Sequence, residues 1–308
     1  MGVPTHGLHY FVHALLPLLK RGAINTGTVS TNGATVHCEG TNGVGFLKLE
    51  QALDSASEVA KSFGCAILTM RNPGKVGALR VYCQKLMDRD QIIIMLKNTA
   101  RTVGIRETAQ PVFGTNPLAI GLPGSDFIYD SSISTIATNK VRLAKKYGRS
   151  FPHPVGLDAS LEQTPVPEDI AAMGGMLLPF SAGPFWFKSF FLGAAIEALA
   201  SFSGGKTGQR VGEHKGSRLL SEEGFMAFVI DRSVSPNYDA YIEEIQMFFR
   251  DLHVAGLKLP GQYDKKKEHV SVLLDDWKEI KAHAGTNIGS RYRDTPQATD
   301  RRPSEMSG

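Results

Sequence analysis

An alternation of helix and strand patterns in the first third of the chain constrains the fold most strongly. In residues 49–63, apolar side chains recur at spacings of three and four, which predicts a helix with one apolar face. Gly64 predicts the end of this helix, and residues 65–70 predict a buried strand. A second helix over residues 77–87 and a second strand over 92–96 follow. Alternation of this kind predicts an α/β fold.

The rest of the chain continues this mixture with longer connections. Further strands are expected at residues 34–38, 118–122, 127–130 and 225–230, and further helices at 5–20, 136–147, 185–202 and 239–254. Helix 185–202 is apolar nearly all round, so we expect it to be buried. The proline-rich segment 148–169 predicts a long loop, and the glycine-rich segment 203–222 a mobile surface loop.

Composition excludes several classes of protein. Apolar residues make up 42% of the chain and charged residues 21%, which excludes a disordered or collagen-like chain. The 34 basic and 30 acidic residues nearly balance, so charge gives no argument for a nucleic-acid partner. The sequence lacks an uninterrupted apolar run of about 18 residues, so we expect no membrane-spanning helix. Its three cysteines lack a C-x-x-C spacing, which favours reduced, cytoplasmic thiols.

Two local patterns allow both a functional and a structural interpretation. Residues 40–45 form a G-x-x-G-x-G arrangement before a helix, where a phosphate could bind. The Rossmann fingerprint is incomplete, however, and a structural turn is the favoured interpretation. His6, His9 and His13 have helical spacing and could gather a metal ion. Because no carboxylate or cysteine lies near them in the sequence, we expect no metal site.

A series of short motifs, read in order, is more specific than either pattern. The segments are Thr5–Tyr10, Glu39–Gly45, Gly114-Thr115-Asn116-Pro117, Asp130 with Ser134, Asn139-Lys140, Pro152–Asp158, Lys188 with Glu197, and Leu259–Gln262. In this order the chain resembles the malate/L-lactate dehydrogenase family that lacks a Rossmann fold, whose relatives include sulfolactate and ureidoglycolate dehydrogenases. The intact G-T-N-P segment is the most specific single match.

The resemblance implies a fold and an activity. The fold would be α/β, with a largely antiparallel sheet in the cofactor domain flanked by helices. The protein would be a cytoplasmic homodimer that transfers a hydride between NAD or NADP and a small 2-oxo acid, in the manner of malate dehydrogenase. Residues 76–235 would form the NAD(P)-binding domain, and residues 1–75 plus 236–288 the substrate and dimer domain. Residues 289–308 would be a disordered tail. Neither nucleic acid nor membrane would be a partner.

The resemblance also implies roles for individual residues. Catalytic roles would fall to His6, Lys75, Lys140 and Asp158, of which His6 is the first choice because the histidine pKa lies near neutral. Thr5 and Tyr10 would contact the substrate. The cofactor would be bound by Gly114, Thr115, Asn116, Pro117, Asp130, Ser134 and Lys188.

The chain departs from the family pattern at residues that are expected to face the substrate. Lys75 stands where the family has a second histidine, and Tyr10 stands where an arginine would clamp the substrate carboxylate. Tyrosine cannot form that bidentate ion pair. The family also has helices ahead of the opening motif, whereas Thr5 lies close to Met1 here, so either those helices are missing or the start of the chain is misassigned. The alternative interpretation is therefore a catalytically impaired pseudoenzyme that keeps the fold and a structural or cofactor-binding role.

Overall fold

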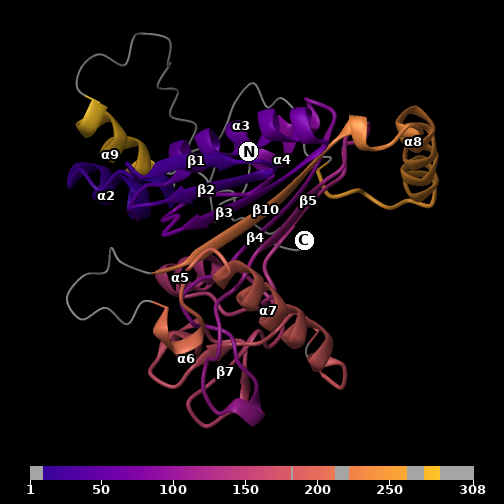
Figure 1. Ribbon diagram of the computed structural model, residues 1–308. Helices are drawn as coiled ribbons and strands as arrows, with labels where there is room; N and C mark the ends of the chain where they lie inside the picture. The colour runs from indigo at the N-terminus through magenta and orange to yellow at the C-terminus, as the bar shows by residue number, and fades with distance from the viewer. Residues whose placement is uncertain (1–9, 182, 212–221, 262–273, 285–308) are drawn as a thin grey trace. The chain divides into compact units, whose positions relative to one another are not determined.

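The computed structural model describes residues 10–181, 183–211, 222–261 and 274–284 (Figure 1). Contacts divide the chain into two compact units, residues 1–270 and 271–308. In the second unit the structure describes helix α9, Leu274–Ala284. The proposed tail 289–308 and the motif residues Thr5 and His6 lie outside the described residues.

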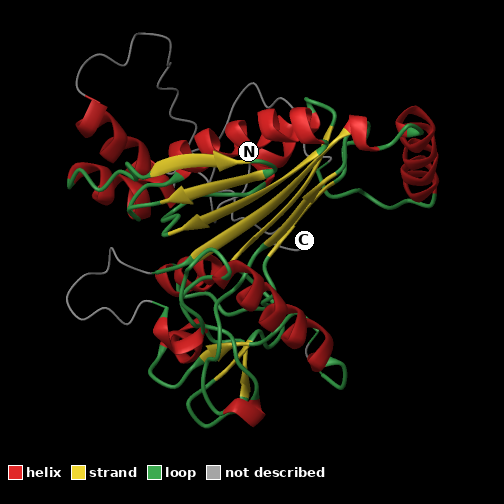
Figure 2. Cartoon of the chain, viewed as in Figure 1, coloured by secondary structure: helices red, strands yellow, loops and turns green. Residues whose placement is uncertain are grey.

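A seven-stranded mixed sheet organises the first unit (Figure 2). In spatial order its strands are β1 (Thr28–Asn32), β2 (Thr35–Glu39), β3 (Cys65–Arg71), β10 (Gly224–Asp231), β4 (Gln91–Lys97), β5 (Leu118–Gly121) and β6 (Ile128–Ser131). All neighbouring pairs are antiparallel except β2 and β3, which are parallel. The predicted α/β fold with a largely antiparallel sheet is confirmed.

Helices cover both faces of this sheet. The amphipathic helix α3 (Phe46–Phe63) and the shorter α4 (Arg80–Met87) pack on one face, and α7 (Trp186–Ser201) packs on the other. Alternate residues of a strand point to opposite faces. In β10, accordingly, Phe225 and Val229 join the core beneath α3 and α4, while Met226 joins the core beneath α7.

Two of the three strands of a smaller sheet lie within the segment predicted to be a loop. Its strands are β8 (Gln163–Thr164), β7 (Gly156–Leu157) and β9 (Met176–Leu177). Helices α5 (Thr138–Lys146) and α6 (Pro167–Ala171) lie in the same part of the chain. The prediction of a loop over 148–169 is thus only partly correct, because strands of two residues are too short to produce a periodic pattern.

The remaining elements are short or peripheral. The predicted helix 5–20 appears in its described part as the π-helical turn η1 (Phe11–Leu15) followed by α2 (Leu16–Lys20). The single turns η2 (Arg106–Thr108), η3 (Gly208–Arg210) and η4 (Arg232–Val234) and the long helix α8 (Tyr238–Val254) complete the fold. None of the described helices is long and apolar enough to cross a membrane.

The prediction that helix 185–202 is buried is only partly correct. Phe190, Ile196 and Ala200 of α7 are buried against the sheet. On the opposite side of the helix, Phe191 is 61% exposed and Leu199 is 46% exposed. A helix that packs on one face of a sheet covers only that face, so an all-round apolar sequence leaves an apolar surface outside.

The glycine-rich segment 40–45 is held by the buried side chain of Asn25. The Asn25 Nδ2 donates to the carbonyl oxygens of Asn72 and Pro73, both at 3.1 Å. Its Oδ1 accepts from the backbone N–H groups of Gly27 at 3.1 Å and Thr41 at 3.0 Å. Gly43 has a φ of 77°, and a side chain there would overlap a neighbouring carbonyl oxygen. Backbone therefore fills the space around these glycines, which favours the structural interpretation.

Replacing Asn25 tests how far this region depends on one side chain. Asn25→Ala leaves two carbonyl oxygens and two N–H groups without their partner, and a buried unsatisfied group costs about 1–3 kcal/mol. We expect a loss of about 2–4 kcal/mol in the free energy of unfolding, measured by urea denaturation. Thr26→Ala, at the exposed neighbouring position, is the control and should change stability by less than about 0.5 kcal/mol. Equal effects of the two substitutions would contradict this assignment.

Candidate active site

One end of the seven-stranded sheet collects the predicted site segments. The antiparallel registers place the last residues of β3, β4 and β6 beside the first residues of β10 and β5. We call this the site end of the sheet. Lys75 follows β3, Asn116 precedes β5, and Ser134 follows β6. Segments that are far apart in the sequence therefore meet at the site end.

The Gly114–Pro117 loop is fixed there by its asparagine. Asn116 is fully buried, and its Nδ2 donates to the Glu197 Oε2 at 2.6 Å and to the Gly193 carbonyl oxygen at 3.1 Å. Its Oδ1 accepts from the backbone N–H of Thr99 at 3.1 Å. Gly114 approaches Thr99 so closely that a side chain would overlap that residue. The most specific motif of the sequence therefore has a tightly packed conformation.

The carboxylate of Glu197 is the centre of this arrangement. Besides Asn116, it accepts from the Asn98 Nδ2 at 3.1 Å and from the backbone N–H of Gly208 at 2.8 Å, both at Oε1. We call these four residues the Glu197 node. Burial raises the pKa of Glu197, and the hydrogen bonds from Gly208 and the two asparagines oppose that rise. The node connects α7, the end of β4, the Gly114–Pro117 loop and η3.

A second polar cluster lies on the face of the sheet opposite the Glu197 node. Lys97, the last residue of β4, forms a buried ion pair with Glu223, which precedes β10. Burial lowers the pKa of Lys97, and the Glu223 carboxylate opposes this effect. Burial, with a smaller contribution from Glu223, raises the pKa of Tyr10 to about 12, so the phenol is protonated at neutral pH. Tyr10, Lys97 and Glu223 thus belong to one electrostatic environment, which Lys75 also influences.

Other predicted cofactor residues lie around β6. The backbone carbonyl oxygen of Thr115 accepts from the N–H of Ile133 at 2.8 Å. Ser134 is buried and donates to the Ile136 carbonyl oxygen at 2.7 Å. The Asp130 carboxylate accepts from the backbone N–H of Arg80 at the start of α4, at 3.0 Å. These side chains position the connections between β6, α4 and α5.

The predicted lysines lie on three separate segments. Lys140 is in the first turn of α5, and Lys188 is in the first turn of α7, where its Nζ lies 5.3 Å from the centre of the Phe185 ring. Lys75 is exposed, and its backbone is hydrogen-bonded to Gly43 and Gly45. In the described part of the chain, none of these three ammonium groups has a carboxylate partner. They are therefore suited to an anionic ligand.

Asp158 occupies a different environment. It lies in the turn between β7 and β8, and its Oδ1 accepts from the backbone N–H groups of Ser160 at 2.8 Å and Glu162 at 2.9 Å. These contacts stabilise its own turn. Of the predicted metal candidates, His6 and His9 lie outside the described residues, and His13 lies in η1. The described residues contain no group of three metal-binding side chains.

The sequence motifs do not include Lys97, Asn98 or Glu223. A lysine and an asparagine directly after the apolar run 92–96 were the available signal, because polar residues that end a buried strand need partners. Glu223 gave no comparable signal, since its partner is 126 residues away in the sequence.

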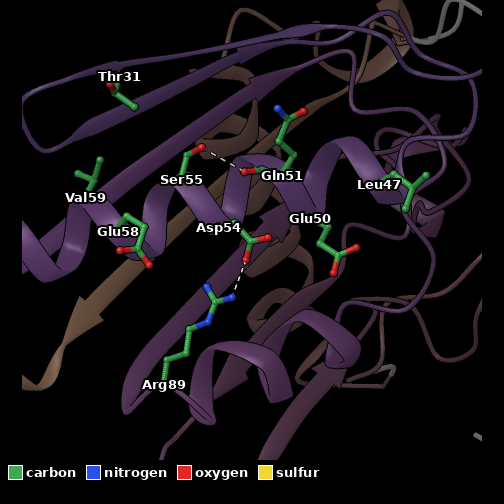
Figure 3. A pocket seen from close by; sticks show the side chains of 9 residues that line it. All are labelled: Thr31, Leu47, Glu50, Gln51, Asp54, Ser55, Glu58, Val59 and Arg89. Carbon is green, nitrogen blue, oxygen red and sulfur yellow. Dashed lines mark hydrogen bonds and ion pairs between the residues drawn. The ribbon is translucent and has the colours of Figure 1, made fainter.

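A groove of about 660 Å³ lies away from all predicted site residues (Figure 3). It runs along α3, where Glu50, Asp54 and Glu58 follow one another at helical spacing. The Asp54 carboxylate accepts from Arg89 at 2.8 Å and from Lys85 at 3.1 Å. In this groove Glu50 pairs with Lys85 and Glu58 pairs with Lys61, as expected for a solvated surface.

Comparison with known proteins places these features in context. The family model described as malate/L-lactate dehydrogenase matches residues 1–269. The L-sulfolactate dehydrogenase of Methanocaldococcus jannaschii is 27% identical over 214 residues, which are 68% of this chain and 61% of that protein. The Delta(1)-pyrroline-2-carboxylate/Delta(1)-piperideine-2-carboxylate reductase of Pseudomonas syringae pv. tomato is 28% identical over 276 residues, or 84% of this chain and 77% of that protein.

Solved structures share the fold. The sulfolactate dehydrogenase from Methanocaldococcus jannaschii superposes with a TM-score of 0.75 at 23% identity, over 90% of this chain and 84% of that one. The piperideine-2-carboxylate reductase from Pseudomonas syringae superposes with a TM-score of 0.77 at 24% identity, over 90% of this chain and 86% of that one. At such identity the agreement concerns the fold alone.

The Glu197 node makes a specific prediction about stability. In Glu197→Gln the amide NH₂ would face an N–H donor in place of an oxygen acceptor, and a charge-assisted hydrogen bond would be lost. We expect a loss of about 2–4 kcal/mol in the free energy of unfolding, measured by chemical denaturation. Glu244→Gln on α8, where the glutamate is exposed, is the matched control and should have little effect. A neutral result at position 197 would show that the node is not a stabilising centre.

Proposed function

The chain belongs to the malate/L-lactate dehydrogenase family, and we propose that it transfers a hydride between NAD(P)H and a small 2-oxo acid. The observation that carries this proposal is the Gly114–Pro117 loop, which the Glu197 node holds rigidly at the site end. A rigid loop at that place can present backbone groups to a ligand without ordering cost.

NAD or NADP is the cofactor of this family, and one relative, the (2R)-3-sulfolactate dehydrogenase of Chromohalobacter salexigens, has NADP(+) in its name. We propose that Gly114, Thr115, Asn116, Pro117, Asp130, Ser134 and Lys188 bind it. The donor set fits this group, because Lys188 has no carboxylate partner in the described chain and suits a cofactor phosphate. When bound, the nicotinamide would supply the hydride.

The proposed substrate residues are Thr5 and Tyr10, and the proposed catalytic residues are His6, Lys75, Lys140 and Asp158. Tyr10, with a pKa of about 12, would donate one hydrogen bond as a neutral phenol. Lys75, which has no carboxylate partner among the described residues, would supply a positive charge to an acid. Asp158 is the weakest candidate, since its Oδ1 already accepts two hydrogen bonds within its own turn.

More specifically, we propose that the activity is like that of malate dehydrogenase. The relatives include malate/(S)-sulfolactate dehydrogenase of Methanothermus fervidus, 25% identical over 292 residues, as well as the pyrroline-2-carboxylate/piperideine-2-carboxylate reductase of Pseudomonas syringae. Their names share a small acid as substrate. We further propose that residues 76–235 bind the cofactor, that residues 1–75 plus 236–288 serve the substrate and the dimer, and that the protein acts in the cytoplasm.

Oxidation of the reduced cofactor tests the activity directly. NADH and NADPH are offered separately against oxaloacetate, pyruvate, 2-oxoglutarate and cyclic imine carboxylates, and the loss of cofactor absorbance is followed. We expect turnover with at least one 2-oxo acid, and a loss of roughly 10²–10⁴-fold in His6→Ala, because a general acid contributes about that much. An unchanged rate would remove His6 from the mechanism. Cofactor binding without any turnover would favour the pseudoenzyme alternative.

The exposed side of α7 supports the proposed homodimer. Phe187, Phe191, Leu192, Leu199 and Phe202 are all at least 39% exposed. Small residues, Ala195 and Ala198, are exposed at the middle of this side, where a second helix could approach closely. Exposed apolar patches of this kind mark association surfaces. A second copy would present the same apolar side, so the two helices could cover each other.

Light scattering coupled to size-exclusion chromatography measures this association. We expect the wild-type protein to run at about twice its 33.4 kDa chain mass, and Phe191→Glu to run as a monomer, because a charge on the apolar side opposes burial. Phe63→Glu is the control, since Phe63 is similarly exposed (60%) but lies at the end of α3. A wild-type monomer, or a dimer that withstands Phe191→Glu, would contradict this surface assignment.

A further inference from the structure

Strand β4 ends on a lysine that is almost entirely buried. The run from Ile92 to Leu96 is apolar, and the Lys97 side chain that follows is 6% exposed. Moving an ammonium group out of water is costly unless it is paired and hydrogen-bonded. Each N–H donor of this buried lysine at the site end should therefore have an acceptor.

The protein satisfies two of the three N–H groups of Lys97. One donates to the Glu223 carboxylate, whose side chain is 3% exposed, and another donates to the Asn98 carbonyl oxygen at 3.1 Å. An ammonium group has three donors and no acceptor. Within the described part of the chain these are its two acceptors, so one N–H remains available. An unused buried donor points to a ligand that completes the site.

Charged groups of both signs act on Lys97. The positive charge comes from Lys75, and the negative charges come from Glu223 and Glu197. Glu223 also acts on Tyr10, as does Arg142. An anion at the unused N–H of Lys97 would therefore also be attracted by the charge of Lys75.

We propose that Lys97 donates its remaining N–H to the carboxylate of the bound acid, and that Glu223 positions the ammonium group for this contact. This inference rests on the proposed function, because it concerns how the same site binds its acid substrate.

Oxalate tests the contact without any hydride transfer. Oxalate has two carboxylates and no ketone that could accept a hydride. Its dissociation constant can therefore be measured by calorimetry without turnover. The variant is Lys97→Met with Glu223→Gln, which removes both charges together and avoids leaving one of them buried alone. Lys85→Met with Glu50→Gln is the matched control, because it removes a partly exposed pair joined at 2.7 Å on α3 and α4 and leaves the same net charge.

We expect the Lys97/Glu223 variant to bind oxalate roughly 10- to 100-fold more weakly, the range for one hydrogen bond to a charged group. NADPH affinity and the melting temperature should remain close to those of the control variant. Oxalate binding equal to that of the control, or no oxalate binding by the wild-type protein, would overturn the inference.

The outcomes separate this inference from the proposed function. Turnover by the wild-type protein together with unchanged oxalate binding in the variant rejects the role of Lys97 alone. Oxalate binding that depends on Lys97, without any cofactor binding or turnover, supports the anion site and rejects the dehydrogenase activity.

Discussion

The end of strand β4 is the constraint on which the rest of the structure depends. Successive strand residues point to opposite faces of a sheet, so Lys97 and Asn98 serve different partners. Lys97 pairs with Glu223, and Asn98 binds Glu197 on α7. The Asn98 Oδ1 also accepts from the backbone N–H of Gly224 at 2.6 Å, which holds β10 in place. Two adjacent residues thereby connect both faces of the sheet at the site end.

Much of the fold follows from local patterns. Helix α3 buries the apolar stripe that its spacing predicts, and strands β3 and β4 match the predicted runs to within a residue or so. Strand β1 was missed because its side chains are mostly exposed and it has no apolar face. The two-residue strands are held by pairing with distant partners, as in β7 with β9. Such pairing leaves no local signature.

The candidate site was predictable only in part, for a related reason. The motif segments could be recognised one by one, and their order indicated the family. The partners of the motif residues could not be recognised, because Asn116 and Glu197 are 81 residues apart in the sequence. The Gly114–Pro117 signature also proves to be partly structural, since its asparagine side chain is used entirely within the protein. A conspicuous motif can thus specify the shape of a loop as much as a contact with a ligand.

The two sides of helix α7 have different partners, and this has a further consequence for binding. Its inner side carries Glu197, and its outer side exposes Phe191 and Leu199. Any molecule that binds the outer side and holds the helix more firmly would also restrict the loop attached to Glu197. Binding at the two places would then be thermodynamically coupled, and by reciprocity a ligand on the loop would strengthen association at the helix to the same extent.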